Sequence, residues 1–185
     1  MAMNMGFYFD QSRCTGCFTC AVACKDWHNI PAGPAARRQV HTLETGRFPE
    51  VSVAFLVTSC YHCAQPSCAD ACPVGAITQR SQDGIVVVDK EKCLGGARCD
   101  LCLRACPYAA PQFAAGDNPK MDMCDFCLDR LVQGQKPVCV ESCPMRALES
   151  GPLKELQARY GGSRTAHGFA YSEETHPSVL FRAKP

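Results

Sequence analysis

Short apolar runs alternate with polar stretches along this sequence of 185 residues, and the longest run spans only residues 53–57. Residues 51–58 predict a β-strand, and residues 85–88 predict a second one directly after an Asp-Gly turn. Between them, residues 72–78 predict the end of a short helix that returns to a strand. Both helices and strands are therefore expected, and all of them are short.

Glycine and proline residues mark the irregular parts of the sequence. They open and close the segment 29–49, where we expect a loop insertion, and residues 117–120 form a second linker. Residues 153–160 predict one helix that ends at a pair of glycines. The polar, irregular remainder, 163–185, is expected to lie extended on a partner or on the body of the domain.

Sixteen residues are cysteines, and they fall into four groups of four. In the first group the spacing is that of bacterial ferredoxins, in which three thiols on one short loop bind three corners of a cubane cluster. The fourth cysteine begins a helix and reaches a second cluster, and in the other groups a proline follows it. The four groups are Cys14, Cys17, Cys20 and Cys24; Cys60, Cys63, Cys68 and Cys72; Cys93, Cys99, Cys102 and Cys106; and Cys124, Cys127, Cys139 and Cys143.

Zinc and disulfides are the alternatives to iron for these thiols. A structural zinc site takes two short cysteine pairs, and the fourth group taken alone has that form. The first group does not, because three cysteines at intervals of two suit a cubane face. Disulfides suit an exported protein, whereas residues 1–6 carry no secretory or twin-arginine signal, so a soluble, reduced, intracellular chain is expected. The pattern therefore predicts four [4Fe–4S] clusters.

The four groups amount to an internal repeat, and the expected fold is α+β with two ferredoxin-like two-cluster units. Groups two and three form one unit at 51–116. By symmetry, groups one and four form the other, from 1–50 and 117–150. Spacing alone also allows group one to pair with group two and group three with group four. Residues 151–185 then form a helix and a partner-binding tail.

Charge and hydropathy narrow the choice of partners. The formal net charge is +1 with both signs mixed, so nucleic acid is not an expected partner. Each cluster with four thiolates carries about −2, which would bring the loaded protein to about −7. No apolar run could span a bilayer, so no membrane span is expected. The protein is expected in the cytoplasm, or exported with a partner that carries a twin-arginine signal.

Several further stretches accompany the cysteines: Gly6-Phe7-Tyr8-Phe9-Asp10, Cys14-Thr15-Gly16-Cys17, Ala23-Cys24-Lys25-Asp26, Asp83-Gly84-Ile85-Val86-Val87-Val88-Asp89, Ala105-Cys106-Pro107-Tyr108, Ala110-Pro111-Gln112-Phe113, Lys136-Pro137-Val138-Cys139-Val140-Glu141-Ser142-Cys143-Pro144 and Arg146-Ala147-Leu148. Together they resemble the four-cluster iron–sulfur subunit of the dimethyl sulfoxide reductase-type molybdoenzymes. The resemblance extends from Gly6 to about Gly162.

The resemblance implies that group one pairs with group four and group two with group three. The implied ligand sets are Cys14, Cys17, Cys20 and Cys143; Cys24, Cys124, Cys127 and Cys139; Cys60, Cys63, Cys68 and Cys106; and Cys72, Cys93, Cys99 and Cys102. It also implies a non-catalytic subunit that relays electrons. One end would face a catalytic subunit with a molybdenum or tungsten bis-pterin cofactor, and the other a quinol-oxidising membrane subunit or a soluble carrier.

The third cysteine group departs from that family. Its members begin this group with Cys-x2-Cys, whereas five residues separate Cys93 from Cys99 here. The longer loop is expected to change the exposure, the hydrogen bonding and the potential of its cluster. Among the residues near the other groups, His62 is expected beside a cluster or on the surface and not as a ligand, and Trp27 is expected to pack over a cluster.

The sequence shows no catalytic constellation, so catalysis by this chain alone is not expected. A free-standing polyferredoxin that serves several oxidoreductases is the alternative function. A zinc-stabilised interaction module is a third.

Overall fold

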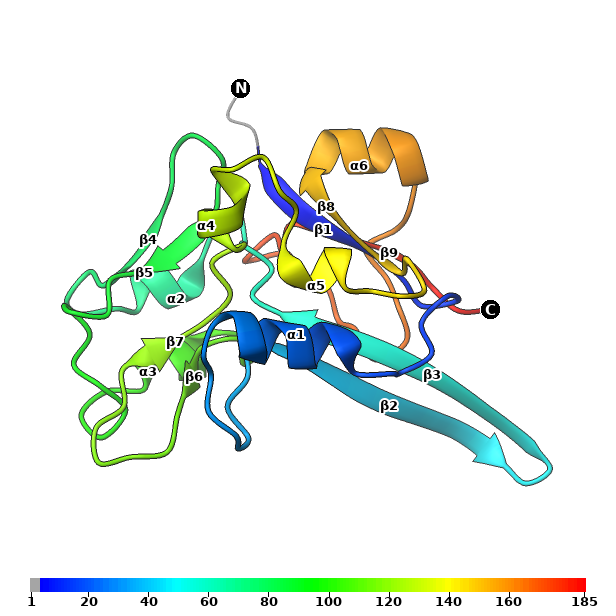
Figure 1. Ribbon diagram of the computed structural model, residues 1–185, viewed down its shortest axis with the longest axis horizontal. Coiled ribbons are helices and arrows are strands. Elements are labelled where there is room, and N and C mark those ends of the chain that lie inside the picture. Colours follow the sequence, from blue (N-terminus) through cyan, green and yellow to red (C-terminus); the bar gives the residue numbers. More distant parts are fainter. Residues whose placement is uncertain (1–3) are drawn as a thin grey trace.

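The computed structural model describes residues 4–185, which form a mixed α+β fold of small sheets and short helices (Figure 1). The largest sheet has three strands in the order β8-β1-β9. Its central strand β1 (Met5–Asp10) is antiparallel to β8 (Leu148–Pro152) and parallel to β9 (Val179–Arg182). All six residues of β1 are buried, so this strand is covered on both faces. Its continuous apolar run suits such a central position, although the sequence did not lead us to predict a strand there.

A long antiparallel hairpin projects from the body and corrects the loop insertion expected at 29–49 (Figure 1). Strand β2 (Arg38–Arg47) pairs along its whole length with β3 (Glu50–Ser59). The glycines and prolines that suggested a loop lie before β2 and at its turn, so they bound the strand. Residues 30–37 lie in no helix or strand, as expected, but the expectation was wrong for 38–47, because strand preference depends on a pairing partner that these residues do not reveal by themselves. The strand predicted at 51–58 is confirmed within β3.

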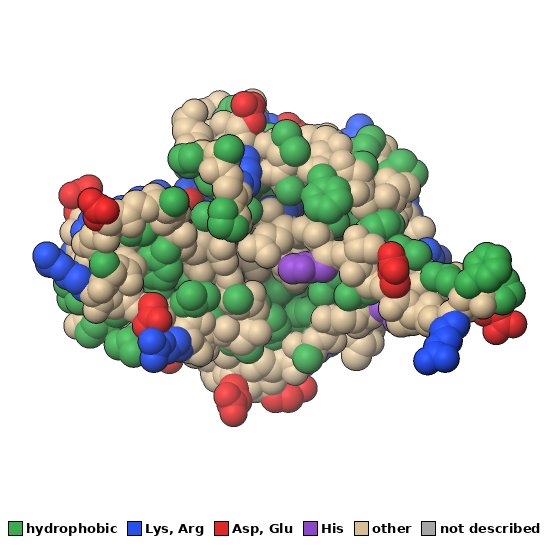
Figure 2. All heavy atoms as spheres, turned by 90° about the horizontal axis from the view of Figure 1, so that it is seen from below, with side chains coloured by type: hydrophobic (Ala, Val, Ile, Leu, Met, Phe, Trp, Pro, Cys, Tyr) green, Lys and Arg blue, Asp and Glu red, His purple; other side chains and the backbone are tan. Residues whose placement is uncertain are grey.

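Figure 2 shows hydrophobic side chains at the far end of this hairpin. Phe48 at the turn is 92% exposed, and Val51 beside it is 51% exposed. The distal half of the hairpin therefore contributes little to the core, whereas Leu56, Val57 and Ser59 at its base are buried.

Two single-turn helices and two small hairpins follow β3. The elements are α2 (Ser67–Asp70), β4 (Ile77–Gln79), β5 (Val86–Val88), α3 (Leu101–Ala105), β6 (Gln112–Phe113) and β7 (Met121–Asp122). Strands β4 and β5 pair as antiparallel neighbours, which confirms the strands predicted near 78 and at 85–88. Strands β6 and β7 pair in the same way around the linker expected at 117–120. Helices α2 and α3 contact each other.

Helix α1 (Thr19–Trp27) contacts α5 (Val138–Glu141), although the two lie far apart in the sequence (Figure 1). The single turn α4 (Leu128–Leu131) precedes α5. Helix α6 (Leu153–Tyr160) has the predicted bounds. It ends at Gly161, whose φ of 64° lies in the left-handed region that glycine adopts at little cost.

The C-terminal segment 163–185 lies on the body of the domain, which is one of the two positions expected for it. It is not irregular throughout, because Val179, Leu180 and Phe181 are buried in β9. Ser163 and Phe181 also exchange two backbone hydrogen bonds of 2.8 Å. The expectation of irregular structure failed here because a run of four residues gives no periodic signal by itself.

The principal core joins the three-stranded sheet to the cysteine-bearing loops. Seven of its buried members are cysteines: Cys20, Cys60, Cys68, Cys102, Cys124, Cys139 and Cys143. Thiol groups therefore occupy positions that aliphatic side chains fill in an ordinary domain. Among residues 4–185, no helix is long and apolar enough to cross a membrane.

Candidate iron–sulfur sites

Cysteines from different groups converge on common pockets. Three pockets are lined by four cysteines each: Cys14, Cys17, Cys20 and Cys143; Cys60, Cys63, Cys68 and Cys106; and Cys72, Cys93, Cys99 and Cys102. Each pocket takes three cysteines from one group and the last cysteine of another. The geometry thus brings group one to group four and group two to group three.

The remaining four cysteines, Cys24, Cys124, Cys127 and Cys139, are all buried. Burial raises the pKa of the Cys24 thiol to about 12, and Cys139 and Cys127 beside it add to the shift. Burial likewise raises the pKa of Cys127 to about 11, again with Cys139 as a neighbour. A fourth set of thiols therefore gathers in the interior between α1 and α5.

Burial disfavours free thiolates in the other sets as well. It raises the pKa of Cys20 to about 11 and that of Cys68 to about 12, because a low-dielectric interior destabilises the charged form. Cys17 is exposed, and a hydrogen bond from Thr19 lowers its pKa. Since thiolates are the ligands of iron, crowded buried thiols of this kind suit a bound metal cluster and disfavour free ionised cysteines.

Backbone N–H groups point at the last cysteine of three groups. Ala76, Ala110 and Ala147 each donate to the sulfur of the cysteine four residues earlier, at 3.3, 3.5 and 3.4 Å. The proline after each of these cysteines lacks an N–H and turns the backbone, so that the later amide faces the sulfur. Such donors stabilise negative charge on a cluster ligand.

The enlarged loop of the third group is held by the linker before β7. Asn118 accepts a hydrogen bond from the Ala97 N–H at 3.2 Å and donates to the Leu94 carbonyl at 3.0 Å. The Gly96 N–H donates to the carbonyl of Pro119 at 2.8 Å. Gly95 has a φ of 90°, a conformation that favours glycine, and a side chain there would also displace the Asn118 amide from these hydrogen bonds. The additional residues therefore form an anchored loop beside Cys93.

A buried arginine supplies a second test of whether the thiols fit a cluster. Arg38 at the base of β2 is only 3% exposed, and its Nη2 has no hydrogen-bond partner among residues 4–185. Its guanidinium interacts electrostatically with Cys139, Cys124, Cys20 and Cys24. A buried cation needs a compensating anion, and a cluster with four thiolates is anionic. The donor set and this cation fit [4Fe–4S] clusters.

His62 is buried, whereas Trp27 lies on the surface. His62 is 1% exposed, and its Nδ1 accepts a hydrogen bond of 3.1 Å from the Val86 N–H. Burial lowers its pKa to about 4, so it is a neutral core residue beside Cys60. Trp27 is 43% exposed; it donates to Asp129 at 2.7 Å and lies beneath the guanidinium of Arg130.

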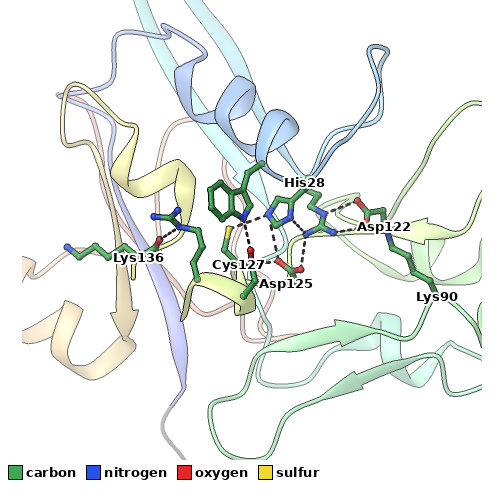
Figure 3. Close-up of polar contacts among 10 residues, drawn as sticks. His28, Lys90, Asp122, Asp125, Cys127 and Lys136 are labelled. Atoms are coloured by element: carbon green, nitrogen blue, oxygen red, sulfur yellow. Dashed lines mark hydrogen bonds and ion pairs between the residues drawn. The ribbon is translucent and has the colours of Figure 1, made fainter. Parts of the chain in front are cut away.

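Figure 3 shows a polar network that the sequence did not suggest. His28 lies beside Cys127, and Arg37 joins His28 to Asp122 and Asp125. These residues come from the end of α1, the segment before β2, and the segment that leads from β7 to α4. Charged residues are distributed throughout this sequence, so no local sequence pattern indicated that these residues would contact one another.

Comparison with known proteins shows the family of this chain. A family model described as a 4Fe-4S dicluster domain matches residues 51–153. The B subunit of the anaerobic dimethyl sulfoxide reductase of Escherichia coli is 40% identical over an alignment that covers 98% of this sequence and 90% of that one. This protein belongs to the same family of iron–sulfur subunits. The probable anaerobic dimethyl sulfoxide reductase subunit YnfG of Escherichia coli matches at the same identity and coverage.

A further relative of this iron–sulfur subunit is the formate dehydrogenase iron-sulfur subunit of Wolinella succinogenes. It is 39% identical over 78% of this sequence and 80% of its own length. The expectation of an iron–sulfur electron-transfer subunit, without catalysis of its own, is confirmed by these relatives. The subunit binds 4Fe-4S clusters through its dicluster domain.

Proposed function

We propose that this iron–sulfur subunit binds four [4Fe–4S] clusters, one on each set of converging thiols. The main observation in support is that the sixteen cysteines gather into four sets of four, and that each set draws its members from two groups. The proposed ligand sets are Cys14, Cys17, Cys20 and Cys143; Cys24, Cys124, Cys127 and Cys139; Cys60, Cys63, Cys68 and Cys106; and Cys72, Cys93, Cys99 and Cys102. Bound clusters supply one-electron oxidation and reduction.

The same sharing of cysteines favours two ferredoxin-like units. The contact of α1 with α5 supports a unit from 1–50 and 117–150, and the contact of α2 with α3 supports a unit at 51–116. In this arrangement each unit holds two clusters. Within 151–185, Thr175 and residues 177–181 are buried, which leaves chiefly helix α6 and residues 163–174 to bind a partner.

The proposed role is to relay electrons between a catalytic subunit with a molybdenum or tungsten bis-pterin cofactor and a quinone-linked or soluble redox partner. Relatives named as a subunit of anaerobic dimethyl sulfoxide reductase and as a formate dehydrogenase iron-sulfur subunit support this role. A location in the cytoplasm, or export with a partner that carries a twin-arginine signal, fits this proposal.

Iron and sulfide analysis of anaerobically purified protein tests the cluster number. Four clusters correspond to about sixteen iron atoms per subunit, and about eight or fewer would contradict the proposal. Purification from the native host then tests the role: a stoichiometric large subunit containing pterin supports it. A protein that purifies alone with full iron would favour the free-standing polyferredoxin.

A further inference from the structure

His28 lies at the C-terminal end of α1 and points toward a cysteine sulfur (Figure 3). Its Nε2 is 3.3 Å from the sulfur of Cys127, within hydrogen-bonding distance for a sulfur acceptor. The carboxylate of Asp125 is farther from the same nitrogen, at 4.0 Å. The histidine side chain is only 10% exposed, so water competes little for this contact.

The opposite ring nitrogen determines which group is the donor. Arg37 Nη1 lies 3.1 Å from His28 Nδ1. A guanidinium can only donate, so Nδ1 must accept and carries no proton. The proton of the neutral ring is then on Nε2, which faces Cys127. Arg37 thereby selects the tautomer that donates to the sulfur.

Arg37 is itself held in place by two carboxylates. Its Nε and Nη2 bind the two oxygens of Asp122 at 2.8 and 3.0 Å, and its Nη1 lies 2.9 Å from Asp125. Lys90, which follows β5, binds Asp122 at 2.7 Å. A bidentate and nearly buried arginine has little freedom to turn, so the orientation of His28 is fixed before any electron arrives.

We propose that His28 is a positioning residue that donates a hydrogen bond from Nε2 to the Cys127 sulfur and thereby raises the reduction potential of one cluster. That cluster is the one on Cys24, Cys124, Cys127 and Cys139, so this inference rests on the proposed function. A donor to a ligand sulfur stabilises the additional negative charge of the reduced state more than it stabilises the oxidised state.

Two substitutions separate a hydrogen-bond role from a structural one. In His28→Leu both polar contacts are lost, whereas in His28→Gln the amide can accept from Arg37 and donate to sulfur. Anaerobic redox titration of the loaded complex, followed by electron paramagnetic resonance, measures each cluster. For His28→Leu we expect about a tenfold fall in the reduced-to-oxidised ratio of one cluster at fixed potential, or about 59 mV for one electron. His28→Gln should restore most of it.

His41 provides a matched control. It lies on the exposed hairpin, where it binds Thr58, and it lines none of the three pockets that hold four cysteines each. His41→Leu should leave all potentials unchanged. Unchanged potentials in His28→Leu with full iron would overturn the proposal, as would equal shifts in every cluster or a His28→Gln variant that behaves like His28→Leu.

The unsubstituted protein offers a readout that does not depend on the folding of a variant. With ¹⁵N-labelled histidine, pulsed electron paramagnetic resonance of the reduced complex should detect, besides a coupling from His62, whose backbone N–H lies 3.5 Å from the Cys60 sulfur, a weak nitrogen coupling from His28 to the cluster on Cys127. Absence of this coupling would overturn the proposal. One equivalent of zinc, lost in His28→Leu, would overturn it too, because His28, Asp125 and Cys127 lie close enough to bind a metal ion. An iron content well below four clusters would instead refute the proposed function.

Discussion

The guanidinium carbon of Arg38 lies 4.7 Å from the centre of the Phe7 ring, in the interior of the protein. The arginine begins the projecting hairpin, and the phenylalanine lies in the central strand of the three-stranded sheet. An aromatic face stabilises a cation only partly, by about 2 kcal/mol or slightly more when desolvated. The rest of the compensation must come from the thiols around Arg38, which include members of two proposed ligand sets. Arg38 therefore lies between the sheet and the ligands of two proposed clusters, and it contacts Phe7 while it interacts electrostatically with the thiols.

Replacement of Arg38 should change the potentials of both clusters in that half of the molecule. For Arg38→Gln we expect the reduction potentials of both clusters to fall by roughly 40–130 mV, because the reduced clusters lose a nearby cation. This corresponds to about 1–3 kcal/mol for one electron. Redox titration of the loaded complex measures this. Arg38→Lys retains the charge and should shift less. Arg47→Gln, at the exposed end of the same strand, is the control, and an equal effect there would contradict the role of Arg38.

Release of the anchored loop should affect one cluster alone. Asn118→Ala removes two hydrogen bonds to the loop at 94–97. Greater access of water to the cluster on Cys93 should raise its potential, by on the order of 30 mV or about threefold in the ratio of reduced to oxidised cluster. Deletion of residues 95–97 should also shift it and leave the other three in place. Asp117→Ala, at the exposed residue next to Asn118, is the control and should leave the potentials of all four clusters unchanged. If Asn118→Ala shifted the potentials of all four clusters, the effect would not be local.

The ion pairs of Asp122 should stabilise the fold without change between pH 8 and pH 5. Although partial burial opposes it, bonding to Arg37 and Lys90 holds the Asp122 pKa below its ordinary value of 3.8. A carboxyl with a depressed pKa stabilises above its unfolded-state pKa and loses this contribution only as the pH falls through the folded value.

We therefore expect Asp122→Asn to lower stability by about 1–3 kcal/mol at neutral pH, and the difference from the unsubstituted protein to stay constant down to pH 5. Anaerobic thermal unfolding at several pH values measures it. Asp117→Asn is the matched control in the same segment. A difference that already shrinks between pH 7 and pH 5 would show that the Asp122 pKa lies above its ordinary value of 3.8, contrary to the effect of the two ion pairs.

Removal of iron should unfold the cysteine-bearing parts of the protein. Seven thiols belong to the principal core, and the segments around them include three helices of only four residues. Helices this short are not stable in isolation. After treatment with a chelator and a reductant, we expect loss of the cooperative thermal transition, and its return when iron and sulfide are restored. A chelated protein that unfolds cooperatively at the original temperature would contradict this dependence.

The chemistry of this protein can be predicted from its residues alone. Thiol spacing is a local property, because a loop that binds three corners of a cubane must carry its cysteines within a few residues. The four groups, the short strands beside them and the helix at 153–160 were therefore accessible without coordinates. The family resemblance rested on equally local motifs around Cys14, Cys106 and Cys143.

Which distant residues meet depends on the tertiary fold. Strand β2 required β3 as its partner, and β9 required β1, so neither was evident from its own residues. Arg38 and His28 gave no signal either, since a charged or titratable side chain has the same appearance in sequence whether it is solvated or buried. Their roles arise because the fold removes water from them and places each beside thiols from another part of the sequence.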